Sequence, residues 1–210
     1  KDDTARKCGH CGHRFVNPQM DFGCAAYCPY AEQCIGSLPE EVLAQKQDLL
    51  KDRVAVEMKR FYKTDFKRIA LASRTARYAE RIAKAQQANL PVVLCAAYLY
   101  GIGIHAEPNG SGPAANETET AKGVGVAESI LSRLNADEKL IQTVCRIVSL
   151  PGRPGTDADW EHQSVWDANR IAAMEDQKKV SSVDAAALQE KIASDLVTPA
   201  GKTEARRVLL

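Results

Sequence analysis

Apolar residues recur with helical spacing along most of the chain after its first 36 residues. In one segment, small or apolar residues fall three or four positions apart, on one stripe of a helix: Leu71, Thr75, Tyr78 and Ile82. The segment from Pro91 to Tyr100 is nearly all apolar, and a helix that is apolar on every side belongs in the middle of a core. Segments that alternate with the period of a strand are nearly absent. The pattern therefore predicts an all-α fold.

Cap and turn residues divide this pattern into separate helices. The run from Ser37 to Glu41 joins a capping serine to a first-turn proline and two acids, so a helix is expected to start there. Gly101 and Gly103 end the apolar helix, and residues 106–116 have the composition of a loop. The expected helices cover a charged region to about residue 62, a segment opened by Asp65, 91–100, 117–134, 136–149, 163–178, 183–196 and a last helix that begins at Thr198-Pro199.

Five of the seven cysteines crowd the first 34 residues: Cys8, Cys11, Cys24, Cys28 and Cys34. A clustered, odd-numbered set that opens with a Cys-x-x-Cys pair favours metal binding over a disulfide framework. Zinc prefers four ligands, and the preferred set is Cys8, Cys11, Cys24 and Cys28, with Cys34 as the spare or as a replacement for Cys28. An iron–sulfur cluster remains the alternative cofactor. Cys95 and Cys145 lie alone in apolar segments and are expected to be small core residues.

The predicted organisation is thus a Cys-rich metal-binding segment over residues 1–36 and a helical domain over residues 37–210. The net charge of +1 gives no signal for nucleic acid, and no apolar run is long enough to span a membrane. The first residues, Lys1-Asp2-Asp3, do not resemble a secretion signal, so a cytoplasmic location is expected. Nothing in the sequence indicates the oligomeric state.

Four segments, taken in order and with their spacing, resemble the HD-domain metal-dependent phosphohydrolases over about residues 60–210. Residues 69–83 are similar to the first helix of that family, and Leu71 stands in the slot of a metal-binding histidine. The stretch Tyr100-Gly101-Ile102-Gly103 stands where the family has its His-Asp pair. Residues 149–155, which include Leu150, occupy the place of a His-rich segment. The run Asp167-Ala168-Asn169 stands in place of an Asp-Ala-Asp segment.

The resemblance implies an HD-domain-like helical bundle whose metal ligands are mostly replaced. Leu71 and Tyr100 do not replace imidazole, and Gly101 has no side chain, so the remaining candidate ligand is Asp167. A lone carboxylate holds a divalent ion too weakly, and no metal is expected in this site. The five slot positions are expected to line one cavity: Leu71, Tyr100, Gly101, Leu150 and Asp167.

The function that this implies is a degenerate phosphohydrolase-like protein, without hydrolase activity, that acts as a binding or regulatory module for a nucleotide or another phosphorylated small molecule. Three arginines are candidates for binding the phosphate: Arg74, Arg153 and Arg170. Asp167 is otherwise expected to form a buried ion pair with a nearby arginine.

Two alternatives stay open, and with them the question whether the chain is an enzyme. One is an active metal-dependent phosphohydrolase with a non-standard set of catalytic residues, drawn from Asp167, His105, Glu107 and His162. His162 on its own is expected at the surface, in a polar loop. The other alternative is a zinc-stapled structural or interaction protein, in which the Cys-rich segment makes the contacts.

Overall fold

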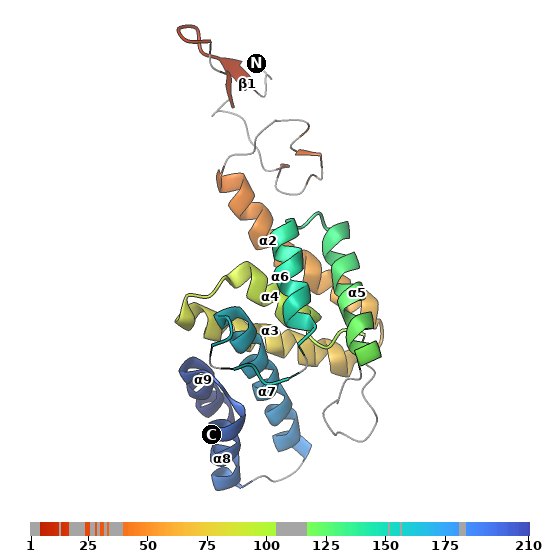
Figure 1. Ribbon diagram of the computed structural model, residues 1–210, viewed down its shortest axis with the longest axis vertical. Helices are drawn as coiled ribbons and strands as arrows, with labels where there is room; N and C mark the ends of the chain where they lie inside the picture. The colour runs from red at the N-terminus through yellow and green to blue at the C-terminus, as the bar shows by residue number, and fades with distance from the viewer. Residues whose placement is uncertain are drawn as a thin grey trace. The chain divides into compact units, whose positions relative to one another are not determined.

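The computed structural model of the chain describes residues 5–12, 14–16, 24, 25, 28, 30, 31, 33, 40–103, 117–150, 152–155, 157–180 and 184–210. The chain divides into two compact units, Lys1–Leu50 and Lys51–Leu210. The domain boundary predicted between residues 36 and 37 lies outside the described residues. Figure 1 shows the elements of both units.

The first unit contains a small antiparallel hairpin that the sequence pattern does not predict. Strand β1 (Ala5–Lys7) pairs with strand β2 (Arg14–Val16), with Arg6 opposite Phe15. Each strand has only three residues, too few for an alternating pattern to stand out from its surroundings. The hairpin turn carries the predicted Cys-x-x-Cys pair, so the two strands hold the ends of that motif together.

The described part of the chain is otherwise helical, which confirms the all-α class. The helices are α2 (Glu40–Tyr62), α3 (Phe66–Gln86), α4 (Leu90–Leu99), α5 (Glu117–Arg133), α6 (Glu138–Val148), α7 (Trp160–Val180), α8 (Ala185–Asp195) and α9 (Pro199–Leu209). Their boundaries lie within a few residues of the predicted ones. The side chains of Asp65 and Thr198 each accept a hydrogen bond from a backbone amide in the first turn of α3 and α9, as their positions predict.

Helices α3 and α7 form the centre of the second unit and run antiparallel to each other. Gln86, at the end of α3, accepts a hydrogen bond from Ser164 in the first turns of α7. Nearer the start of α3, Tyr78 donates to Glu175, close to the end of α7. Helix α4 packs against both of them, as well as against α6. Figure 1 shows α3 in yellow, α4 in yellow-green, α6 in blue-green and α7 in blue.

Helix α4 is almost fully enclosed, which confirms the prediction from its uniformly apolar sequence. Its residues from Val92 to Ala97 are buried, and so is Leu99. The helix ends as the glycines predict, because Gly101 and Gly103 adopt φ angles of +75° and +79° that other residues rarely take. Between these two glycines, Ile102 is fully buried.

Helices α5, α6, α8 and α9 pack in two pairs around this centre. Helix α5 lies against α6, and α8 against α9, while α9 also contacts both α3 and α7. Over the residues that the structure describes, no helix combines the length and apolarity that crossing a membrane requires.

Candidate functional site

Asp167, the expected remnant of a metal site, has a structural role in this fold. Its side chain is fully buried, and its Oδ1 atom accepts a hydrogen bond from the amide of Val197 at 2.8 Å. Its Oδ2 atom accepts from the amide of Thr198 at 2.8 Å and from the hydroxyl of Thr198 at 2.7 Å. Burial raises the pKa of Asp167, and the donors from Thr198 and Val197 oppose that rise. Both oxygens are thus occupied in holding the start of α9.

The expected ion pair between Asp167 and an arginine is wrong, since its partners are the backbone and side chain of residues 197 and 198. A Cβ atom on Gly201 would collide with the same carboxylate, which explains the glycine in the first turn of α9. Asp167 is therefore part of a helix-capping arrangement and not an open ligand.

The structure also separates Asp167 from Leu71, the first slot of the expected metal site. Leu71 lies one turn before Arg74, whose guanidinium reaches Glu175 and Asp176 near the end of α7. Asp167 lies about eight residues earlier on α7, which corresponds to roughly 12 Å along the helix axis. Leu71 and Asp167 therefore lie at different levels of the α3–α7 pair, and the shared cavity of the five slot positions stays a prediction.

The other slot positions offer no metal ligand. Burial raises the pKa of the Tyr100 phenol to about 12, with a smaller opposing effect of Arg170, so this side chain is neutral near pH 7. Gly101 has no side chain, and Leu150 is apolar and 37% exposed. Asn169 is half-buried on α7. The residues present do not fit a catalytic divalent metal, because imidazole and free carboxylate groups are absent from these positions.

Two of the three arginines predicted to bind phosphate are already paired with carboxylates. Arg74 pairs with Glu175 and Asp176, and Arg170 pairs with Asp195 while its guanidinium lies over the ring of Trp166. Arg153 is exposed in the segment before α7. A phosphate that binds Arg74 or Arg170 would therefore have to compete with these carboxylates.

Of the alternative catalytic residues, His105 and Glu107 lie outside the described residues. His162 contradicts its predicted place in a surface loop, because it lies in the first turn of α7 and is only 4% exposed. Among the residues that the structure describes, its Nε2 atom has no hydrogen-bond partner. Burial lowers the pKa of His162, with a further lowering by Arg146 that Asp159 opposes. The loop prediction failed because helix α7 begins at Trp160, earlier than its apolar periodicity suggests.

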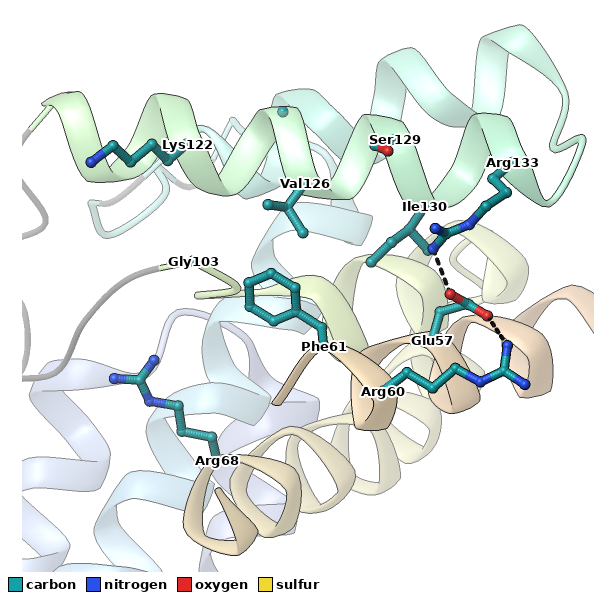
Figure 2. Close-up of a pocket in the computed structure, with 11 residues that line it drawn as sticks. Glu57, Arg60, Phe61, Arg68, Gly103, Lys122, Val126, Ser129, Ile130 and Arg133 are labelled. Atoms are coloured by element: carbon teal, nitrogen blue, oxygen red, sulfur yellow. Dashed lines mark hydrogen bonds and ion pairs between the residues drawn. The ribbon is translucent and has the colours of Figure 1, made fainter. Parts of the chain in front are cut away.

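The second unit also contains a large open groove, which none of the slot positions line. It lies between the end of α2, the start of α3, helix α5 and the turn that follows α4. Its volume is about 1030 Å³. Figure 2 shows its lining side chains, which include four cations, one carboxylate and the edge of an aromatic ring. The residues are Glu57, Arg60, Phe61, Arg68, Gly103, Lys122, Gly125, Val126, Ser129, Ile130 and Arg133.

At one end of this basic groove, Glu57 binds two arginines at once. Its Oε1 atom accepts from Arg60 on the next turn of α2, and its Oε2 atom accepts from Arg133 at the end of α5. The side chain of Glu57 is only 12% exposed. This end of the groove is therefore closed by an ion-pair bridge between α2 and α5, which Figure 2 marks with dashed lines.

At the other end, Arg68 on α3 and Lys122 on α5 line opposite walls of the groove (Figure 2). Arg68 has a partly exposed ion pair with Asp65 at 3.2 Å. Within the described part of the chain, Lys122 forms no ion pair. The ring of Phe61, 42% exposed, lies between the two ends and points toward α5. This end therefore presents positive charge beside an apolar surface.

Glycines set the distance between the two walls. A Cβ atom on Gly123 would collide with the carbonyl oxygen of Ile102, so α5 and the turn after α4 touch through their backbones. Gly125, on the other hand, has no atom within 4 Å of the position of a Cβ. Because Gly125 has no side chain, the groove extends up to the backbone of α5 at this position. Gly123 allows α5 to pack directly against the turn after α4.

The sequence pattern does not point to these groove residues. The four cations of the groove come from three helices and have no common spacing along the chain, so that each one resembles an ordinary surface residue. The pair Gly123 and Gly125 is the one available signal. Glycine in the interior of a helix is unfavourable, and it often marks a close approach of another backbone.

The predicted zinc ligands lie in the first unit. Cys8 and Cys11 flank the hairpin turn, and Cys24 and Cys28 lie one turn apart, with the amide of Cys28 bonded to the carbonyl of Cys24. All four are free thiols, and Cys34 lies outside the described residues. Among the described residues, no three histidine, cysteine or acidic side chains converge. In the second unit, Cys95 is buried as predicted and Cys145 is half-buried.

Comparisons of the chain with protein-family models, with curated proteins and with solved structures find no match.

Proposed function

We propose that the helical unit is a degenerate HD-like domain that binds a nucleotide, or a phosphorylated small molecule of similar size, in the basic groove without hydrolysing it. The HD-like ancestry rests on the sequence resemblance alone. The observation that carries the binding function is the end of the groove where Arg68 and Lys122 oppose each other beside Phe61.

The chemistry of this end matches the two parts of a nucleotide. Two cations on opposite walls can bind a phosphate group from both sides, and guanidinium groups match phosphate geometry. The exposed ring of Phe61 and the side chain of Val126 offer an apolar surface to a base. The groove volume of about 1030 Å³ is at the upper end of the range of small-molecule sites.

The absence of hydrolysis is proposed from the slot positions of the resemblance. A metal-assisted hydrolase must hold its ion with several imidazole or carboxylate ligands. Leu71, Tyr100 and Gly101 supply none, and the carboxylate of Asp167 is occupied by Val197 and Thr198.

Calorimetric titration of the full chain with AMP, ADP and ATP tests the proposal. We expect binding that strengthens with the number of phosphates and weakens as salt is added, because the attraction is electrostatic. Lys122→Gln should weaken binding by about tenfold, the cost of one charge-assisted contact. Lys139→Gln is the matched control, since this exposed lysine lies on α6, outside the lining of the groove.

A second pair of variants tests whether a bulky side chain in the groove prevents binding, with the charges of the groove unchanged. Gly125→Leu should abolish binding because its side chain would occupy the open space in front of α5. Gly125→Ala adds a single methyl group at the same position and should leave binding nearly unchanged. Both variants should stay folded, which circular dichroism would verify, since nothing lies near the new Cβ.

The proposal is overturned if none of the three nucleotides binds at millimolar concentration, or if Lys122→Gln and Gly125→Leu bind as well as the parent chain. Release of phosphate from the nucleotides after addition of Mn²⁺ would overturn the part that excludes hydrolysis.

A further inference from the structure

We infer that Tyr62 positions Arg68 to bind the terminal phosphate group of a nucleotide, so that the groove selects phosphomonoesters over phosphodiesters. This inference rests on the proposed nucleotide binding and adds to it the residue that sets its selectivity. Tyr62 is not one of the residues that line the groove, and it acts through Arg68, which lines the groove at the start of α3.

Two neighbouring side chains hold the guanidinium group of Arg68. Its Cζ atom lies over the ring of Tyr62, 5.8 Å from the ring centre, which is the geometry of a cation–π contact. Its Nε atom pairs with the carboxylate of Asp65 at 3.2 Å. Within the part of the chain that the structure describes, no ion pair engages the two terminal nitrogens of Arg68. The side chain therefore offers the groove a supported fork of N–H donors.

Tyr62 is itself fixed by contacts with two other parts of the unit. Its hydroxyl donates a hydrogen bond to the carbonyl oxygen of Gly101, in the turn after α4, at 3.4 Å. Its ring meets the ring of Phe61 edge to face, with centroids 5.4 Å apart and planes at 76°. Burial raises the pKa of Tyr62 to about 12, an effect that Arg68 opposes and Asp65 increases, so the phenol is neutral near pH 7. The ring therefore supports Arg68 without adding a negative charge.

A supported guanidinium discriminates among kinds of phosphate group. It can bind two oxygens of one phosphate at once, and it loses less rotamer freedom on binding because its position is already fixed. Lys122, on the opposite wall, can bind a third oxygen. A phosphomonoester has three terminal oxygens and nearly two negative charges, whereas a phosphodiester has two such oxygens and a single charge. Arg68 and Lys122 together therefore match a phosphomonoester better than a phosphodiester.

Calorimetric titration of the full chain with AMP and with the methyl ester of AMP tests the inference, because the two ligands differ only at the phosphate. The parent chain should bind AMP about tenfold more tightly, the value of one charge-assisted contact. Tyr62→Leu removes the ring under Arg68 and should reduce this preference to about twofold. Tyr62→Phe keeps the ring and should restore the preference. Phe66→Leu is the matched control, since Phe66 is 73% exposed and lies outside the lining of the groove.

A double-mutant cycle separates the positioning of Arg68 from a general structural effect. If Tyr62 acts through Arg68, Tyr62→Leu should cause no further loss of AMP affinity in a chain that already carries Arg68→Gln. In a chain that carries Lys122→Gln, Tyr62→Leu should weaken AMP binding by the same factor as in the parent chain. Equal losses of AMP affinity in both backgrounds would mean that Tyr62 only stabilises the fold, and would overturn the inference.

Nuclear magnetic resonance of the parent chain covers the case in which Tyr62→Leu does not fold. A nuclear Overhauser contact between the Tyr62 ring and the Arg68 side chain is expected, and AMP should shift the Arg68 Nε–H signal. Absence of either result overturns the inference.

The titrations distinguish this inference from the proposed function. A parent chain that binds none of the nucleotides overturns the proposed function and this inference with it. A parent chain that binds AMP and its methyl ester equally, or a folded Tyr62→Leu variant that keeps the full preference for AMP, overturns this inference alone.

Discussion

Asp167 illustrates how a single buried carboxylate can join two helices. Three donors from Val197 and Thr198 satisfy its two oxygens, and the hydroxyl of Thr198 in turn accepts the amide of Gly201 at 2.8 Å. The start of α9 is therefore tied to the middle of α7 through a chain of buried and part-buried hydrogen bonds. Removing the carboxylate would leave several buried donors without partners.

We therefore expect Asp167→Ala to lower the free energy of unfolding by about 3 kcal/mol, the cost of unsatisfied buried donors. Urea denaturation measures this value. Asp184→Ala is the matched control, because Asp184 precedes α8 as a cap residue without a side-chain hydrogen bond to that helix. The control should change stability by less than about 0.5 kcal/mol. Equal losses in both variants would contradict the role given to Asp167.

His162 is the residue that should make stability depend on pH near neutrality. Its folded pKa lies below the usual value because the side chain is buried and Arg146 is near, with Asp159 opposing. The unfolded chain therefore takes up the proton first, and the free energy of unfolding should fall as the pH drops below about 6.5.

Denaturation at several values between about pH 7 and pH 5 measures this dependence. His162→Gln should flatten the curve, whatever its effect on stability at pH 7. His10→Gln is the control, because His10 is exposed in the hairpin turn and should leave the curve unchanged. A parent chain whose stability does not fall over this range would show that His162 is not the responsible group.

At the scale of elements, the contact between α5 and the turn after α4 depends on Gly123 and not on Gly125. Gly123 touches the carbonyl of Ile102, whereas Gly125 faces open space two residues later on the same helix. Both glycines lie inside α5, but Gly123 is in close contact with another backbone and Gly125 is not. Substitutions at the two positions therefore separate the effect of helix propensity on stability from the effect of packing.

Gly125→Ala should raise the free energy of unfolding by about 0.5–1 kcal/mol, since alanine is the better helix former. Gly123→Ala should lower it by about 1–3 kcal/mol, because the new methyl group forces the two backbones apart. Thermal denaturation followed by circular dichroism distinguishes the signs. Stabilisation by both variants would mean that α5 can shift without cost.

The helices themselves could be predicted because their signals are local. Asp65 and Thr198 mark the start of a helix by their own chemistry, and the apolar run before Gly101 marks a buried helix by composition. The hairpin β1–β2 was missed because three-residue strands carry no periodic signal. The burial of His162 was missed because it depends on how α7 packs, which no single segment reveals.

At the scale of the whole molecule, the candidate sites of the two units differ in how far the sequence alone predicts which residues come together. The cysteines of the first unit are close together along the chain, so that the sequence alone reveals their grouping. The groove of the second unit unites Arg60, Arg68, Lys122 and Arg133 from three helices, and their meeting depends on the packing of the whole unit. The shared cavity expected from the family resemblance also depends on packing, since Leu71 and Asp167 lie on different helices, α3 and α7.

The two units also differ in what holds them together. The helical unit has its own core around α3, α4 and α7, with Val93, Leu99 and Ile171 fully buried. Among the residues before Lys51 whose burial the structure describes, Ala25, Ala31 and Leu50 are buried. Apolar burial in the core around α3, α4 and α7 is a main source of stability for the second unit.

The bridge of Glu57 to Arg60 and Arg133 has a consequence for selectivity. This carboxylate is a built-in counter-ion, and an anion that approaches Arg133 must compete with it for the same guanidinium. Under the proposed nucleotide binding, a polyphosphate held at Arg68 and Lys122 would extend toward Arg133, whereas a singly charged anion such as chloride would gain little by that exchange. The groove would thereby discriminate among anions by valence and length, and Glu57 would set the threshold.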